Sequence, residues 1–413
     1  MPDCGQNKAS GVFTENRNFS EFFPVKHKYI ILFCAAAFFF WAALYLYVPI
    51  LPVYARSLGA NLSMVGTVIA SYALPQLLFR IPAGIFFDAI KRRKLLIAGG
   101  ILTTSVGALA LGLAPNLWLL FLARAITGLG AVFWVTIIVY FAAYYPQQDS
   151  QRAIGIISFV QGAAIVTATA CGGVIAEALG FGYTFWVAAF LGVISLIALI
   201  ATPQPPVTRG EPVSPVSWQR FKGVATFSPL LMVSLMGILV HFANFAVIFG
   251  FIPIYATQIG ASSTDLGIVS MLSLATSAVA ALTVAPTARR LGNSFTILAG
   301  AILMGVAILI IPLVHNVHLL EAVMVINGLG TGILRTILMS MCVQGIPPEQ
   351  RATAMGFYQA VYSAGMLLGP LISGYLADSL GLAAVFYLSA SFSLIIAVMA
   401  YLPVLTRSPE LKI

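Results

Sequence analysis

The sequence predicts an all-α polytopic membrane protein with twelve transmembrane helices, arranged as two six-helix halves in parallel repeat. The first observation is composition: of the 413 residues, 60% are hydrophobic and 8% are charged. Soluble proteins carry about 25% charged residues, so this chain lacks the polar surface that a soluble fold needs. A membrane-spanning helix takes about 20 apolar residues, which leaves room for about twelve spans. These numbers exclude a soluble enzyme, a disordered protein and a disulfide scaffold.

The second observation is the spacing of the apolar runs. In the first half they fall at about 29–53, 63–87, 95–114, 117–142, 153–176 and 182–202. In the second half they fall at about 228–254, 265–287, 294–314, 319–343, 352–377 and 382–404. Runs of this length suit helices, because transmembrane β-strands would be about ten residues long and would alternate in polarity.

The runs divide the chain into five parts. We expect a cytoplasmic N-terminal segment (1–28), an N-terminal bundle (29–202), a Pro-rich cytoplasmic linker (203–227), a C-terminal bundle (228–404) and a cytoplasmic tail (405–413). The first run is long enough to span a membrane, so we expect an uncleaved helix rather than a signal peptide.

The distribution of basic residues predicts the orientation. Most of the 21 Lys and Arg residues fall in the termini, the linker and the loops on the same side, whereas the opposite loops hold only Arg56. By the positive-inside rule both termini are cytoplasmic, in the inner or plasma membrane. Topology therefore accounts for the net charge of +9, and we expect no nucleic-acid partner.

The third observation is an internal repeat. Ser57–Ala60 recurs as Gln258–Ala261, and Ile126–Gly130 recurs as Ile326–Gly330, at an offset of about 200 residues that is kept along the chain. Parallel repeats of this kind are related by an axis along the membrane normal, with a substrate site near the midplane between them.

The cysteines indicate no metal or disulfide framework. Cys4, Cys34, Cys171 and Cys342 are widely scattered, without the close spacing of a metal site. We expect small packed thiols, no metal and no cofactor.

Three motifs carry a family resemblance. Gly84 is followed by Asp88 and then by the basic cluster 91–94, Arg124 opens an Arg-x-x-x-Gly-x-Gly element, and 369–374 reads Gly-Pro-x-x-x-Gly. The chain resembles the major facilitator superfamily over about 29–404, in its 12-helix form and nearest to the drug and metabolite efflux branch. Two departures are Lys91, where the family usually has Gly, and Ala168-Thr169, where drug antiporters usually carry Gly-Pro. The resemblance implies a monomer that works by alternating access.

The first motif predicts a conformational switch. Gly84 allows close helix approach, and Asp88 can pair with basic neighbours or with a facing helix N-terminus. We therefore assign a switch to Gly84, Asp88, Arg92 and Arg93. The alternative is a basic anchor that only orients the hairpin. The corresponding loop of the second half, at Arg289 and Arg290, carries no acid, so we expect an asymmetric switch.

The membrane interior is predicted to hold three cations and no anion. Arg80, Arg124 and Arg335 fall within the apolar runs, whereas the acids fall in loops or at helix ends. Buried ionisable groups are costly, which makes them functional candidates. For Arg80 and Arg335 the alternative is a side chain that reaches back to the membrane surface, while Arg124 matches a motif whose arginine faces the cavity in the family.

Further polar side chains complete a predicted substrate site. They are Gln76, Gln161, His241, Asn244, Asn327, Gln359 and Tyr362. Each could instead hold helices together. His241 titrates near neutrality in its unperturbed state, so it is a candidate proton carrier; a packed neutral histidine bonded to a carbonyl is the alternative.

The functional prediction is secondary active transport of a small organic solute. The resemblance favours ion- or proton-coupled efflux of a drug-like compound or metabolite. The electrostatics favour an alternative, uptake or exchange of an organic anion held by the intramembrane arginines. A membrane enzyme or a non-transporting sensor is the alternative from another class, but the runs carry no acid cluster, and we expect no enzymatic activity. The expected partners are the solute, protons and the lipid bilayer.

Overall fold

A computed structural model describes residues 27–89, 93–146, 149–205, 218–347 and 350–403. These residues form helices joined by short turns and contain no β-strand. Twelve helical segments among them are long and apolar enough to cross a membrane. The predicted fold class is therefore confirmed.

Among the described residues the first half comprises nine helical elements. They are α1 (His27–Tyr45), α2 (Leu51–Ser57), α3 (Leu62–Ala70), α4 (Ala73–Ala89), α5 (Arg93–Leu113), α6 (Leu117–Ala131), α7 (Trp134–Ala142), α8 (Ser150–Leu179) and α9 (Phe181–Ile200).

The second half repeats this order after a short helix, α10 (Trp218–Ala225), which lies within the predicted linker. It continues with α11 (Ser228–Ala246), the π-helix η2 (Val247–Phe251), α12 (Ile252–Gln258), α13 (Ser263–Leu291), α14 (Asn293–Ile310), the 3₁₀ turn η3 (Ile311–Leu313), α15 (Val317–Met341), α16 (Arg351–Leu380) and α17 (Leu382–Met399).

Several predicted spans are interrupted rather than continuous. The first span breaks between α1 and α2, and its counterpart in the second half changes into a π-helix between α11 and α12. Pro52 and Pro253 stand in the first turns of α2 and α12. Proline has no backbone N–H and tolerates only the first turn of a helix, which accounts for new helices starting there. Discontinuous helices at a repeat interface commonly surround transport sites.

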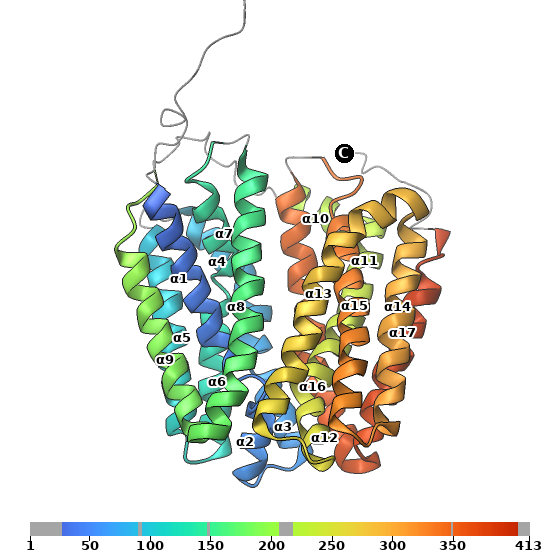
Figure 1. Cartoon of the computed structure of the whole chain (residues 1–413). Coiled ribbons are helices and arrows are strands. Elements are labelled where there is room, and N and C mark those ends of the chain that lie inside the picture. The colour runs from blue at the N-terminus through green and yellow to red at the C-terminus, as the bar shows by residue number, and fades with distance from the viewer. Residues whose placement is uncertain (1–26, 90–92, 147–148, 206–217, 348–349, 404–413) are drawn as a thin grey trace, which may run out of the picture.

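The two ends of the bundle are chemically distinct. At the end where α1 begins and α17 ends (the terminal end), the Lys94 ammonium donates to the carbonyl oxygens of Ile200, at 2.8 Å, and Thr202. The Tyr144 hydroxyl there donates to the Pro203 carbonyl at 2.6 Å. The opposite end (the far end) holds α2 and α12, and α8 and α13 converge there while separating toward the terminal end (Figure 1).

Glycines bring the halves into backbone contact near the far end. A Cβ on Gly66 of α3 would lie 2.1 Å from the Pro370 carbonyl oxygen of α16. A Cβ on Gly173 of α8 would lie 2.4 Å from the Ser263 carbonyl oxygen of α13. Since real side chains do not approach backbone so closely, these two contacts require glycine.

Two carboxylates reinforce the same contacts. Asp378 at the end of α16 accepts hydrogen bonds from the Leu62 and Ser63 amides, at 2.9 and 2.8 Å, and from the Ser63 hydroxyl. Glu177 at the end of α8 accepts from the Thr264 amide at 2.8 Å. Each carboxylate thus caps the N-terminus of a helix in the other half, where the helix dipole favours negative charge. We call these two interactions the far-end caps.

Candidate substrate site

Four of the predicted site residues meet between the halves. Arg80 of α4 donates to the Gln76 side-chain oxygen at 2.9 Å and to the Tyr362 hydroxyl of α16 at 3.5 Å. His241 of α11 stacks on Tyr362 with ring centroids 3.9 Å apart and planes 6° from parallel. We call Gln76, Arg80, His241 and Tyr362 the central cluster.

Helix geometry explains the orientation of these side chains. Gln76 and Arg80 are four residues apart and so share a face of α4, and the Gln76 amide is anchored by donating to the Tyr72 carbonyl at 3.1 Å. The His241 Nδ1 lies 2.9 Å from the Gly237 carbonyl oxygen. A carbonyl only accepts, so Nδ1 carries the hydrogen and Nε2 keeps its lone pair. The Nε2 atom is then the position at which a proton could bind.

Arg335 lies beside the central cluster. Its side chain is exposed in the last third of α15, close enough to His241, Tyr45 and Tyr358 for its charge to influence them. Those partners show that it faces the interior between the halves. No described residue forms an ion pair with it.

Arg124 has a different environment. It is 4% exposed, and its guanidinium lies 4.2 Å from the Tyr72 ring centroid and 5.4 Å from that of Tyr47. It also donates to the Tyr47 hydroxyl at 3.1 Å and contacts the Thr127 hydroxyl at 3.4 Å. Cation–π contacts of this kind stabilise a buried cation. Arg124 is thus held inside the first half by that half's own side chains.

Aromatic rings close the centre on its far side. Tyr45 contacts Phe249 with centroids 5.9 Å apart, and Tyr72 stacks on Phe245 at 6.5 Å, so both pairs cross between the halves. Along the chain from the far end, Tyr72 comes before Arg80 and therefore lies nearer to that end. Phe245 and Phe249 follow His241 as the chain runs toward the far end, so they too lie nearer to it than the central cluster does. We call Tyr45, Tyr72, Phe245 and Phe249 the aromatic layer. It separates the central cluster from the far end.

The other predicted site residues are dispersed. Asn327 is buried within the second half, where it accepts from the Ser273 hydroxyl at 3.5 Å, an interhelical contact rather than a cavity position. Asn244 and Gln359 are buried, and the Asn244 Oδ1 atom has no described partner. Gln161 is half-buried on α8.

The predicted switch is described in part. Gly84 and Asp88 lie in the last turns of α4, with side chains outside the described set, and Arg92 lies outside the described residues. Arg93 begins α5 and is exposed. Within the described part of the chain no group of His, Cys, Asp and Glu could hold a metal.

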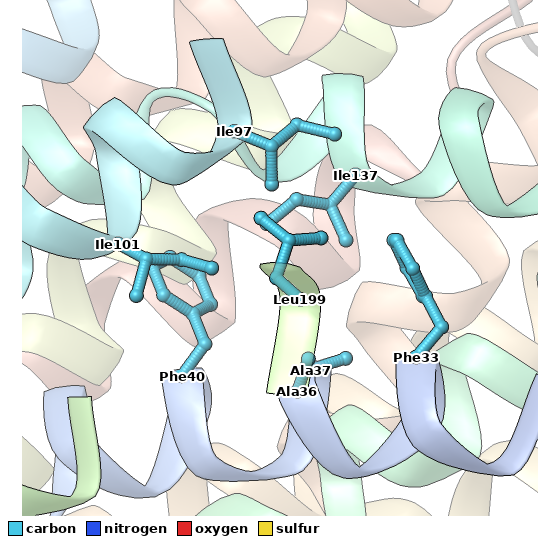
Figure 2. A pocket seen from close by; sticks show the side chains of 8 residues that line it. All are labelled: Phe33, Ala36, Ala37, Phe40, Ile97, Ile101, Ile137 and Leu199. Atoms are coloured by element: carbon cyan, nitrogen blue, oxygen red, sulfur yellow. The ribbon is translucent and has the colours of Figure 1, made fainter. Parts of the chain in front are cut away.

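A small cavity inside the first half is unsuited to a polar ligand. Figure 2 shows that only apolar side chains line it: Phe33, Ala36, Ala37, Phe40, Ile97, Ile101, Ile137 and Leu199. Apolar voids of this kind remain dry. It is a packing void between α1, α5, α7 and α9, and the polar site lies elsewhere, between the halves.

Sequence reasoning missed the aromatic layer and the far-end caps as functional features. The aromatic layer cannot be recognised in the sequence, because aromatic residues at helical spacing occur in any apolar span. The caps did leave a signal. Asp378 occupies the position in the second half that Glu177 occupies in the first, and Thr264 likewise corresponds to Ser63. Both pairs keep the offset of about 200 residues that relates the halves.

A twelve-span bundle of two repeated halves, with polar side chains meeting between them, is the architecture of a membrane transporter. A sequence model of the Major Facilitator Superfamily matches residues 33–243 and 234–413. The chain belongs to this family, and it is a transporter of small molecules rather than an enzyme.

Relatives agree with this assignment. An uncharacterized MFS-type transporter of Methanocaldococcus jannaschii is 24% identical over 363 residues, covering 86% of this chain and 92% of the relative. The multidrug resistance protein MdtG of Citrobacter koseri is 25% identical over 376 residues, covering 87% of this chain and 91% of the relative.

Solved structures share the fold. A bacterial homolog of the human lysosomal transporter Spinster, in an inward-facing and occupied conformation, superposes with a TM-score of 0.80 at 15% identity, covering 93% of this chain and 97% of that one. The nucleoside transporter NupG superposes with a TM-score of 0.77, also at 15% identity, covering 90% and 98%.

Proposed function

We propose that this protein exports a small amphipathic solute from the cytoplasm by alternating access. The observation that carries the proposal is the position of the central cluster. The far-end caps, the glycine contacts and the aromatic layer close it off from the far end. The cluster is therefore reached from the terminal end, which the positive-inside rule assigns to the cytoplasm of the inner or plasma membrane.

The relatives support the proposed direction of transport. A site that opens toward the cytoplasm can take up a solute there, and release outside requires the far end to open. The name of the related multidrug resistance protein MdtG supports export of drug-like compounds.

Opening the far end requires the caps to break. Hydrogen bonds to charged groups contribute about 1.5–3 kcal/mol each, so the caps stabilise the closed far end. When they break, contacts formed at the terminal end must supply a comparable stabilisation. The switch at Gly84, Asp88, Arg92 and Arg93 is our candidate for those contacts.

We further propose that export is coupled to protons through His241. Its Nε2 atom has a free lone pair, and the ring stacks on Tyr362 of α16 within the central cluster. Protonation would add a positive charge beside Arg80 and Arg335, and would thereby disfavour this arrangement of the cluster.

Transport by purified protein in liposomes tests the proposal. We would load a cationic compound (ethidium), an anion (2-naphthoate) and a neutral compound (chloramphenicol) in separate experiments and impose a pH gradient. We expect gradient-driven movement of at least one compound, and loss of the gradient dependence in His241→Gln. If folded protein moves none of them, the export proposal is wrong. Movement that is indifferent to the gradient would overturn the proton coupling alone.

A further inference from the structure

We propose that the exported solute is a lipophilic organic anion whose carboxylate or sulfonate lies between Arg80 and Arg335. This inference rests on the proposed function and specifies its substrate class. It also moves the anion site away from Arg124, the arginine that the sequence motif singles out.

The charge balance of the interior is the first step. Arg80, Arg124 and Arg335 lie within spans, and in the described part of the chain no carboxylate forms an ion pair with any of them. The described acids stand near the ends of the bundle, as Glu177 and Asp378 do in the far-end caps. Among the described residues nothing balances these positive charges, and an anionic ligand would supply the missing negative charge.

The second step separates the three arginines by their surroundings. The guanidinium of Arg124 is enclosed by the rings of Tyr47 and Tyr72 and is hydrogen-bonded to its own half. Arg80 is hydrogen-bonded at both terminal nitrogens to neutral groups, and Arg335 is exposed without a described ion-pair partner. The charges of both Arg80 and Arg335 act on His241. Arg80 comes from the first half, where it contacts Tyr362, and Arg335 comes from the second half, so we infer that an anion beside His241 would be within reach of both.

The third step is the imbalance of donors and acceptors. Buried N–H groups at Trp41 Nε1, Arg80 Nε and Arg124 Nε have no described acceptor. The other buried side-chain atoms without a described partner are Asn244 Oδ1 and six hydroxyls, and hydroxyls can either donate or accept. Leaving a buried donor unpaired costs about 1–3 kcal/mol. Of these donors Arg80 Nε belongs to the central cluster, and a ligand that brings several acceptor oxygens, as a carboxylate or a sulfonate does, would supply its acceptor.

The fourth step concerns the rest of the ligand. The floor of the site is the aromatic layer, and one turn from its Tyr45 the Trp41 ring contacts Trp134 edge-on with ring centroids 5.0 Å apart. Aromatic and apolar groups pack well on such faces. An aromatic carboxylate therefore suits both the arginines and the aromatic layer. A lipophilic cation would instead meet the uncompensated positive charge of the arginines.

Binding of three ligands of the same shape tests the inference. The probes are 2-naphthoate, the uncharged 2-naphthamide and the cation 2-naphthylmethylammonium, titrated calorimetrically against the purified full chain. We expect 2-naphthoate to bind about tenfold or more tighter than the amide, as charge-assisted bidentate pairing would give. We expect the cation to bind more weakly than either.

Substitutions locate the anion. Arg80→Gln and Arg335→Gln should each weaken naphthoate binding about tenfold and leave amide binding unchanged, while Arg335→Lys should retain part of the preference. Arg289→Gln, which removes an exposed charge at the terminal end of α13, is the matched control and should change nothing. Because Arg335 is exposed, its variants test the site even if Arg80→Gln fails to fold.

Two results would overturn the inference: equal binding of naphthoate and naphthamide, or tighter binding of the cation. Neither would affect the export proposal, because gradient-driven ethidium movement would then still support it. Failure of all three naphthyl ligands to bind, with no compound moved in liposomes, would reject both.

Discussion

The far end and the terminal end of the bundle hold the two halves in different ways. At the far end the contacts are paired by the repeat: a glycine contact and a carboxylate cap from each half. At the terminal end the loop after the second span of the first half carries Asp88, whereas the matching loop of the second half has Arg289 and Arg290 without an acid. The difference implies that the far end determines the state described here.

The two far-end caps are themselves unequal. Asp378 accepts three hydrogen bonds from Leu62 and Ser63, whereas Glu177 accepts one from the Thr264 amide and has the Thr264 and Ser262 hydroxyls beside it. The repeat therefore preserves the position of the cap but not its hydrogen-bond geometry. Substitutions at the two ends should show this order directly, and we rank them from the largest effect to the smallest.

The largest effect is expected from Gly66→Ala. The added Cβ would lie 2.1 Å from a carbonyl oxygen of the backbone, so the halves must separate at the far end. We expect maleimide labelling of Thr264→Cys, in a background without the native cysteines, to accelerate about tenfold or more, corresponding to more than about 1.4 kcal/mol. Gly155→Ala is the control, since a Cβ there meets no atom within 4 Å. Equal labelling of the two variants would contradict the close contact.

Asp378→Asn should have the next largest effect. It removes the charge at the N-terminus of α3 and leaves an amide that cannot accept from all three donors of the cap. We expect a loss of about 1.5–3 kcal/mol in the closed far end. The same labelling assay would report it, and a rate unchanged from the parent protein would show that the cap contributes nothing.

Glu177→Gln should have a smaller effect in the same direction, because it weakens the hydrogen bond from the Thr264 amide while keeping the side chain's length. Since the two caps share no residue, the double variant should be additive within about 0.5 kcal/mol. A larger effect for Glu177→Gln than for Asp378→Asn would reverse the proposed order of the caps.

The smallest effect is expected from Asp88→Asn, and in the opposite direction. The proposed switch stabilises the state in which the terminal end is closed, so weakening it favours the state described here. We expect labelling at Thr264→Cys to slow by a factor that corresponds to about 0.3–1 kcal/mol. Faster labelling would contradict the assignment of Asp88 to the terminal-end switch.

The fold was largely predictable from the sequence, because span length and hydropathy are local properties. The twelve spans and the repeat are confirmed. The interruption of the first span was not predicted: residues 46–50 are as apolar as their neighbours, and hydropathy does not register the helix start that Pro52 imposes.

The site was predictable only in part. Gln76 and Arg80 were paired by their helical spacing, and the structure brings them to Tyr362 and His241. The environment of Arg124 depends on Tyr47 and Tyr72, which lie far from it in sequence. No local pattern reveals which arginine is enclosed by rings and which remains open.

The central claim is that the two ends open alternately, and paired distance measurements test it most directly. One spin-label pair at Ser57 and Gln258 reports the far end across the halves, and a second at Ile154 of α8 and Arg290 of α13 reports the terminal end. When Asp378→Asn and Glu177→Gln are combined, we predict that the far-end distance lengthens while the terminal-end distance shortens. A far-end distance that lengthens with no change at the terminal end would contradict the alternating mechanism.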